Sequence, residues 1–163
     1  MRTILVALAL ATSFAASPAL SADFRLARVR QNSAEVIDLA AVKSNLFGHR
    51  TMTLYDVGPP IAGTHGLTRY GELDLIFDCP KRLVRSEAIS FFREDFSRES
   101  RQRAIPPFPG PAWEPLHNPE IVEDFGLACA RNPEAQRFGE RLDVADWRSA
   151  LLVARARLRT PQS

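Results

Sequence analysis

The stretch that most constrains the fold is Tyr70-Gly71-Glu72-Leu73-Asp74-Leu75-Ile76-Phe77-Asp78-Cys79. Its apolar side chains and Cys79 fall on one side of an extended chain and its acidic side chains on the other, with Ile76 as the exception. An alternation with a period of two residues predicts an antiparallel strand that is buried on one face. The alternation places the Cys79 sulfur on the apolar face. Pro80 then ends the strand, because proline cannot donate a hydrogen bond to a neighbouring strand.

Shorter runs rich in β-branched, aromatic and other apolar residues predict more strands around this one. We expect them at residues 24–30, 34–37, 49–57 and 82–93. Gln31-Asn32-Ser33 is typical of a turn between the first two, and Asp38 is suited to cap one helical turn at 39–42. Residues 58–69, rich in Gly, Pro, Thr and His, predict a loop.

The segment from 94 to 117 is expected to be irregular. Residues 93–103 mix charges of both signs, and residues 106–115 carry five prolines around Trp113, which favours polyproline II and turns. Our preferred interpretation is a rigid loop that Trp113 anchors in the core. The alternative is a proline-rich ligand site.

Asn118-Pro119-Glu120 predicts the start of a helix, with a cap residue, a proline at the first helical position and an acid in the first turn. Apolar residues then recur at helical spacing as far as Cys129, so Cys129 should face inward. Cys79 and Cys129 are the only cysteines, and we predict that they form a disulfide. Free thiols or a redox pair are the alternative, which no Cys-x-x-Cys spacing supports.

A last helix is predicted over about 144–159, capped by Asp143, with a narrow apolar stripe. Arg155, Arg157 and Arg159 lie near its C-terminus, where the helix dipole favours cations. We treat residues 131–163 as an extension outside the two-cysteine domain and expect these arginines to be dispensable for folding. An amphipathic helix for a membrane surface or a partner is the alternative.

The N-terminus has the pattern of a secretory signal peptide over residues 1–22. Arg2 precedes an apolar run from Ile4 to Ala16, and small residues follow Pro18. We expect cleavage between Ala22 and Asp23, with cleavage after Ser21 as the alternative. The apolar run is too short for a transmembrane anchor. No cysteine lies in this segment to carry a lipid, so we expect a periplasmic or secreted protein.

The charge balance bears on the class of partner. Removing residues 1–22 from the 163 residues leaves about 141, enough for one domain, here residues 23–130 with the extension. The formal net charge falls from +2 to +1 with the loss of Arg2, which argues against nucleic acid as the main partner. No second long apolar run follows, so no transmembrane segment is expected in the mature chain.

No catalytic, metal-binding or cofactor-binding motif is present, and we predict no cofactor. A zinc site built from His65 with Asp74 or Asp78 is the alternative, although His49, His65 and His117 lack ligand spacing. The acids Glu72, Asp74 and Asp78 could bind a cation or act as acid and base, but the solvated face of a sheet is the simpler interpretation. Neither Ser90 nor Ser97 has a histidine nearby in the sequence.

In their order along residues 23–130, several elements resemble the surface-adhesin protein E-like family of Gram-negative bacteria. They are Asp23-Phe24, Val36-Ile37-Asp38, Phe77-Asp78-Cys79 followed by Arg82, Trp113-Glu114-Pro115, and a short helix ending at Cys129. The resemblance implies a small sheet with a helix held on it by the disulfide, and one member of the family binds host matrix proteins at the cell surface. Of the family's residues, only Cys79 and Cys129 carry over to this chain.

The expected fold is therefore α+β. It comprises a small antiparallel sheet of five or six strands, a helix tethered to it by the disulfide, and a C-terminal helical extension. The expected function is that of an exported, non-enzymatic, adhesin-like binding module of the bacterial envelope, with another envelope protein or a host matrix protein as partner. A small periplasmic enzyme or inhibitor, assembled from scattered residues, is the alternative.

Overall fold

The computed structural model describes residues 22–63, 66–103, 113–130 and 138–159. The predicted signal peptide, apart from Ala22, lies outside these residues, as do His65 and most of the proline-rich segment. The elements in chain order are β1 (Phe24–Val29), β2 (Ala34–Asp38), the 3₁₀ turn η1 (Leu39–Ala41), β3 (Lys43–Ser44), β4 (Arg50–Gly63), β5 (Gly66–Asp78), β6 (Leu83–Arg93), β7 (Arg98–Arg103), β8 (Glu114–Pro115), α1 (Pro119–Cys129), β9 (Glu140–Arg141) and α2 (Trp147–Arg159).

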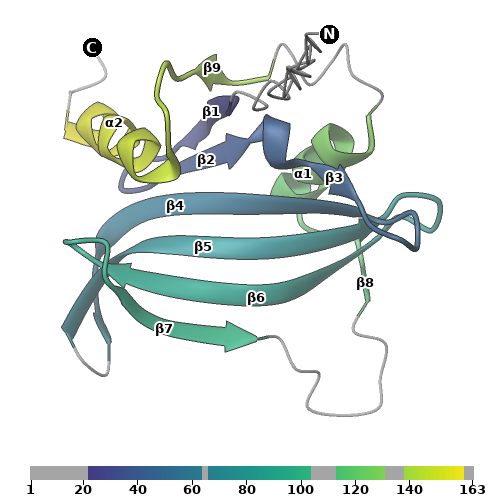
Figure 1. Cartoon of the computed structure of the whole chain (residues 1–163), viewed down its shortest axis with the longest axis horizontal. Helices are drawn as coiled ribbons and strands as arrows, with labels where there is room; N and C mark the ends of the chain where they lie inside the picture. Colours follow the sequence, from purple (N-terminus) through teal and green to yellow (C-terminus); the bar gives the residue numbers. More distant parts are fainter. Residues whose placement is uncertain (1–21, 64–65, 104–112, 131–137, 160–163) are drawn as a thin grey trace, which may run out of the picture.

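One large antiparallel sheet dominates the described part of the chain (Figure 1). It has nine strands in the order β7-β6-β5-β4-β2-β1-β9, with β3 paired to β4 and β8 paired to β6. The expectation of a small sheet of five or six strands was therefore wrong. The strands that were not expected are the two-residue strands β3, β8 and β9 and the charged edge strand β7. None of them carries a clear alternation of apolar residues.

The predicted loop over residues 58–69 is mostly strand. β4 continues past Pro59 and Pro60 to Gly63, and β5 begins at Gly66, so the two strands form a long hairpin. The pairing register shifts between Val57 and Ile61. An irregularity of this kind accommodates proline in a strand, because it removes the need for a ladder hydrogen bond.

The segment after β6 also contains an unexpected strand. A turn closed by hydrogen bonds between Arg93 and Ser97 leads into β7, and Phe96 in this turn has a φ of 61°. β7 has the sequence Arg-Glu-Ser-Arg-Gln-Arg and lies at the edge of the sheet. Charged side chains on an edge strand oppose pairing with other chains, which explains a strand without an apolar face.

The two faces of the sheet pack against different helices. α2 covers one face with a core that includes Tyr70, Phe92 and Leu151. α1 covers the opposite face with a core that includes Ile37, Phe77 and Leu127. The helices lie towards opposite ends of the sheet, α2 on the left and α1 on the right in Figure 1. Within the described residues, no helix has the length and apolar character needed to cross a membrane.

The C-terminal helix packs into the core, whereas we expected an extension outside the two-cysteine domain. The dispensability of its arginines for folding stays a prediction. Ala150, Leu151 and Ala154 are 0% exposed, because their spacing puts them on one stripe of α2 against the sheet. The helix also starts later than expected. Asp146, rather than Asp143, accepts hydrogen bonds from the backbone N–H groups of residues 148 and 149.

α1 begins at the predicted cap, where the Asn118 side chain accepts a hydrogen bond from the Glu120 N–H. It ends at Cys129, which forms a disulfide with Cys79 just after β5, with 5.7 Å between the α-carbons. Arg50 of β4 donates to the carbonyl of Ala128 at 3.1 Å. The C-terminal turn of α1 is thus fixed to the sheet by one covalent bond and one hydrogen bond.

Candidate functional site

The loop between β3 and β4 exposes two large apolar side chains and is held by hydrogen bonds of Asn45. The Asn45 side chain accepts hydrogen bonds from the N–H groups of Phe47 and His49, at 2.9 and 3.1 Å. Gly48, with φ of 76°, provides the left-handed residue that closes the loop. Leu46 and Phe47 are 101% and 82% exposed. A loop held in this way displays both side chains to solvent at little cost in conformational entropy on binding.

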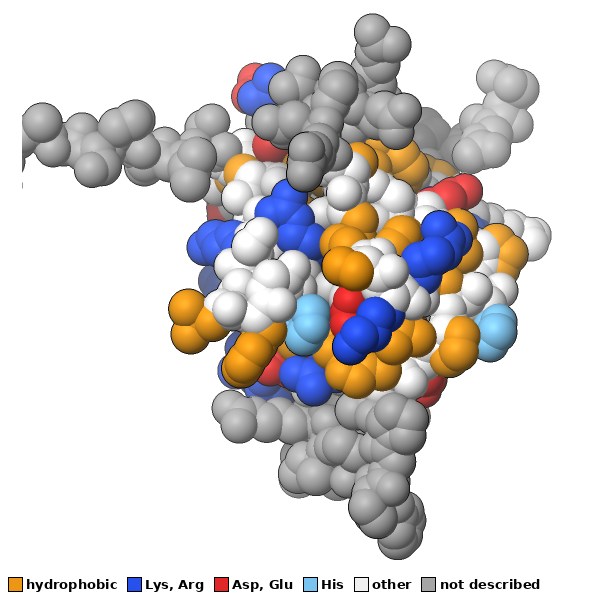
Figure 2. Space-filling view, turned by 90° about the vertical axis from the view of Figure 1, so that its right-hand side faces the viewer, with side chains coloured by type: hydrophobic (Ala, Val, Ile, Leu, Met, Phe, Trp, Pro, Cys, Tyr) orange, Lys and Arg blue, Asp and Glu red, His pale blue; other side chains and the backbone are white. Residues whose placement is uncertain are grey.

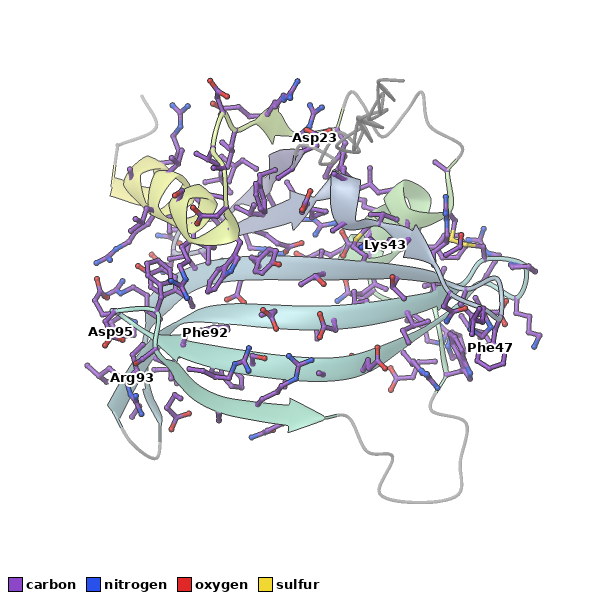
Figure 3. The ribbon with its side chains drawn as sticks, in the orientation of Figure 1. Asp23, Lys43, Phe47, Phe92, Arg93 and Asp95 are labelled. Atoms are coloured by element: carbon purple, nitrogen blue, oxygen red, sulfur yellow. A yellow bond between two sulfur atoms is a disulfide. The ribbon has the colours of Figure 1, made fainter. Side chains whose placement is uncertain are left out.

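A cleft of about 500 Å³ opens beside this loop. Figure 3 shows Phe47 at the right-hand end of the molecule, far from Phe92 near α2. Figure 2 views this right-hand end and shows hydrophobic side chains gathered there, with lysine and arginine side chains between them. The residues around the cleft include Phe47, His49, Ile76, Arg85, Glu87 and Trp113.

Trp113 lies in the wall of this cleft and is only half-buried, so the expectation that it anchors a loop in the core was wrong. The His49 ring meets its indole edge-on, with ring centroids 4.8 Å apart. The Arg85 guanidinium lies over the same indole, 5.1 Å from the ring centroid, at cation–π distance. Within the described residues, this guanidinium makes no hydrogen bond or ion pair, so its donors are available to a ligand.

A β-bulge shapes the rim of the cleft. The β5–β6 register shifts between Asp74 and Leu75, and Glu87 is the extra residue on β6 at this point. The bulge places the Glu87 carboxylate on the cleft together with Arg85. The cleft thus has an aromatic interior with one cation and one anion on the same strand.

The predicted row of acids is split by the structure. Glu72 and Asp74 lie on the face of the sheet that α2 covers, but beyond the end of this helix. Both bind Arg101, at 3.3 and 2.9 Å. Asp78 instead accepts a hydrogen bond from the Lys81 N–H in the turn after β5, and its carboxylate lies 3.7 Å from the His49 imidazole. Each of these acids therefore already has a partner within the protein, and we interpret their role as structural.

The remaining sequence candidates do not assemble into a reaction centre. Ser90 is fully buried and donates to Glu72 at 3.1 Å, and Ser97 binds Asp95 and Arg93. His117 is exposed. The zinc alternative depends on His65, which lies outside the described residues. In the described ranges, no group of three or more His, Cys, Asp or Glu side chains is placed to hold a metal ion.

The face of the sheet that α1 covers, here called the α1 face, carries a network of charged side chains that the sequence did not reveal. Arg28, whose side chain is 11% exposed, binds Glu35, Glu123 and Asp124. Arg30 adds contacts to Glu35 and to Glu120 in the first turn of α1. Glu35 is 7 and 5 positions from these arginines, but the acids of α1 are 90 to 96 positions away. No local motif could have signalled that they meet.

A second pocket, of about 310 Å³, lies beside this network. It is lined by Leu54 and Leu73 together with Arg30, Glu35, Asp56 and Glu120. Asp56 is exposed at the pocket. The surrounding protein, and then the charge of Glu35, raise the pKa of its carboxyl, whereas Arg30 lowers it.

Comparison of the chain with known protein families, curated proteins and solved structures finds no match. A function therefore has to be proposed from the geometry of the cleft beside Trp113 and from the sequence.

Proposed function

We propose that this chain is an exported, non-enzymatic binding module. It engages a protein partner through the cleft lined by Phe47, His49 and Trp113, which we call the aromatic cleft. The observation that carries the proposal is the hydrogen-bonded Asn45–Gly48 loop, which exposes Leu46 and Phe47 beside the cleft of Trp113. Interfaces concentrate binding energy in aromatic and arginine residues at their centre. An exposed apolar pair next to such residues is typical of an interaction surface.

The partner's chemistry follows from the charges of the cleft. The Arg85 guanidinium lies over Trp113 and has no hydrogen bond or ion pair among the described residues. It is suited to a carboxylate, which it can bind through two parallel hydrogen bonds. The aromatic walls suit an apolar or aromatic side chain. We therefore infer that the partner presents an exposed segment in which an acidic residue lies close to a large apolar one.

The disulfide supports export, because such bonds persist in oxidising compartments such as the periplasm and the extracellular medium. The signal-peptide pattern of residues 1–22 points to the same compartment. Membership of the adhesin E-like family remains part of this proposal. It rests on the order of the sequence elements around Cys79 and Cys129.

The test is selection of phage-displayed random peptides on protein recovered from an export-competent host. We expect the selected peptides to share an acidic residue near an aromatic or aliphatic one. Their binding, measured by fluorescence polarisation, should weaken at least about tenfold in Leu46→Ser/Phe47→Ser and in Arg85→Gln.

A matched control is available at the opposite end of the sheet. Ile61 and Leu67 are 63% and 61% exposed on the β4–β5 hairpin. The variant Ile61→Ser/Leu67→Ser removes a similar apolar surface and should bind the peptides normally. Peptides that bind both double variants equally, or a loop that binds lipid vesicles and no peptide, would overturn the proposal.

A further inference from the structure

We propose that the pocket on the α1 face binds a small organic cation, an alkylammonium such as a diamine, with the Asp56 carboxylate as its counter-ion. This site lies on the opposite face of the sheet from the aromatic cleft and does not depend on the function proposed for the cleft. The pocket is bounded by β2, β4, β5 and the first turn of α1.

The first argument is an uncompensated charge. Glu35 of β2 and Asp56 of β4 are direct cross-strand partners. Like charges in that position repel each other. Glu35 is compensated by Arg28 and Arg30, which both contact its carboxylate. Among the described residues, Asp56 has no hydrogen bond or ion pair, so its charge is left for a ligand.

The second argument is the position of the Asp56 side chain, which depends on a glycine. Gly71 is the partner of Asp56 on the other side, in β5. A β-carbon on Gly71 would lie 2.0 Å from Asp56 Oδ1, so the carboxylate occupies the space above the glycine. The absence of a side chain at residue 71 therefore allows Asp56 to lean towards β5, away from Glu35 and beside the pocket.

The third argument is the charge of the whole network. Five carboxylates, those of Glu35, Asp56, Glu120, Glu123 and Asp124, face only two guanidiniums, those of Arg28 and Arg30. Asp124 is 1% exposed, and its Oδ2 has no hydrogen-bond partner in the described structure. The network next to the pocket therefore carries an excess of negative charge within the protein, which favours a cation.

The shape of the pocket selects the kind of cation. Leu54 and Leu73 contribute apolar surface to a volume of about 310 Å³, the lower end of the range for small-molecule sites. In the described ranges, no three acids or histidines are arranged around one point to hold a metal ion. An ammonium group on a short alkyl chain satisfies both the carboxylate and the apolar surface, which a hydrated metal ion does not.

The test is isothermal titration calorimetry with 1,4-diaminobutane, with 1,4-butanediol as the neutral analogue of the same length and Mg²⁺ as the inorganic cation. We expect the diamine to bind and the diol not to bind. Asp56→Asn should weaken diamine binding at least about tenfold, because a charge-assisted hydrogen bond is lost. Asp74→Asn, which changes a carboxylate on the opposite face, should leave binding unchanged.

Two further variants keep the proposal falsifiable if Asp56→Asn folds poorly. Ser33→Tyr places a ring at the edge of the pocket without changing its charge and should also abolish diamine binding. The Leu46→Ser/Phe47→Ser variant should bind the diamine normally, which separates this site from the cleft. Diamine binding that persists in Ser33→Tyr and Asp56→Asn, equal binding of the diol, or the absence of diamine binding would overturn the proposal.

Discussion

The indole of Trp147 lies parallel to the phenol ring of Tyr55, with ring centroids 5.5 Å apart and an interplanar angle of 9°. The same indole contacts Phe92 and Phe96, at centroid distances of 5.0 and 5.6 Å. About two helical turns after Trp147, Arg155 donates to the Tyr70 hydroxyl at 3.1 Å. The start of α2 and its later turns are thus joined to strands β4, β5 and β6 and to the β6–β7 turn. The stability of the sheet should therefore depend on α2.

Two adjacent leucines of α2 provide a sharp test of this dependence. Leu151 is 0% exposed, whereas Leu152 is 49% exposed on the other side of the helix. We expect Leu151→Ala to lower the free energy of unfolding by about 2–5 kcal/mol, because it leaves a cavity in the core. Leu152→Ala should change it by about 0.5 kcal/mol or less. Urea unfolding measures both, and equally small losses would show that α2 is not part of the cooperative core.

The Cys79–Cys129 disulfide should also contribute strongly to stability. It joins residues separated by 50 positions, and closing a loop of that length in the unfolded chain is worth about 4 kcal/mol in the chain-entropy model. We expect Cys79→Ala/Cys129→Ala to lose about 2–5 kcal/mol in urea unfolding. Wild-type protein unfolded in a reducing agent should lose a similar amount. A loss below about 1 kcal/mol, or two free thiols found by mass spectrometry of unreduced protein, would contradict this expectation.

The elements predicted best from the sequence are those in which local pattern and tertiary role agree. The alternation of residues 70–78 lies within β5, with Leu75 and Phe77 buried against α1, and Cys79 follows directly after the strand. The cap at Asn118 starts α1, and the structure bonds Cys129 to Cys79. In each case a residue's immediate neighbours already define its buried side, so the pattern can be recognised without knowledge of the fold.

The elements that were missed depend on contacts between distant residues. β7 is a strand because it pairs with β6, and its charged sequence would suit a loop equally well. The apolar stripe of α2 was recognised, but nothing local showed that Tyr55 and Phe92 form the surface beneath it. The cleft likewise brings together residues 45–51, 76, 85–87 and 113, whose chemistry emerges only after folding.

Asp124 should make stability fall as pH rises between about 4 and 6. Burial raises the pKa of its carboxyl from 3.8 to about 6, against the opposing effect of Arg28. In this window the folded protein retains a proton that the unfolded chain has lost, so each increase in pH favours unfolding. Above about pH 6 the penalty for a buried carboxylate is present in full.

We therefore expect Asp124→Asn to be more stable than wild type at pH 8, by about 1–3 kcal/mol, with the difference vanishing below about pH 4. Thermal or urea unfolding across this range measures the difference directly. Glu123→Gln is the matched control, because Glu123 also contacts Arg28 but its side chain is 58% exposed. A stability difference between wild type and Asp124→Asn that does not change with pH would contradict the raised pKa of Asp124.

Gly71 and Asp56 should be energetically coupled. In Gly71→Ala the new β-carbon would displace the Asp56 carboxylate from its position above residue 71. The carboxylate must then adopt a poorer rotamer, and we expect a loss of about 1 kcal/mol in the free energy of unfolding. In an Asp56→Ala background the same substitution meets no carboxylate, so it should be neutral or slightly stabilising, because alanine loses less conformational entropy than glycine on folding.

The double-mutant cycle of these two substitutions, measured by urea unfolding, should therefore give a coupling energy of about 1 kcal/mol. Gly71→Ala should also weaken diamine binding, because it moves the proposed counter-ion while leaving every charge in place. Gly58→Ala is the control, since Gly58 has open space where a β-carbon would lie. If Gly71→Ala costs the same in both backgrounds, the space above residue 71 does not set the position of Asp56. The carboxylate would then have to be held over the pocket by another contact.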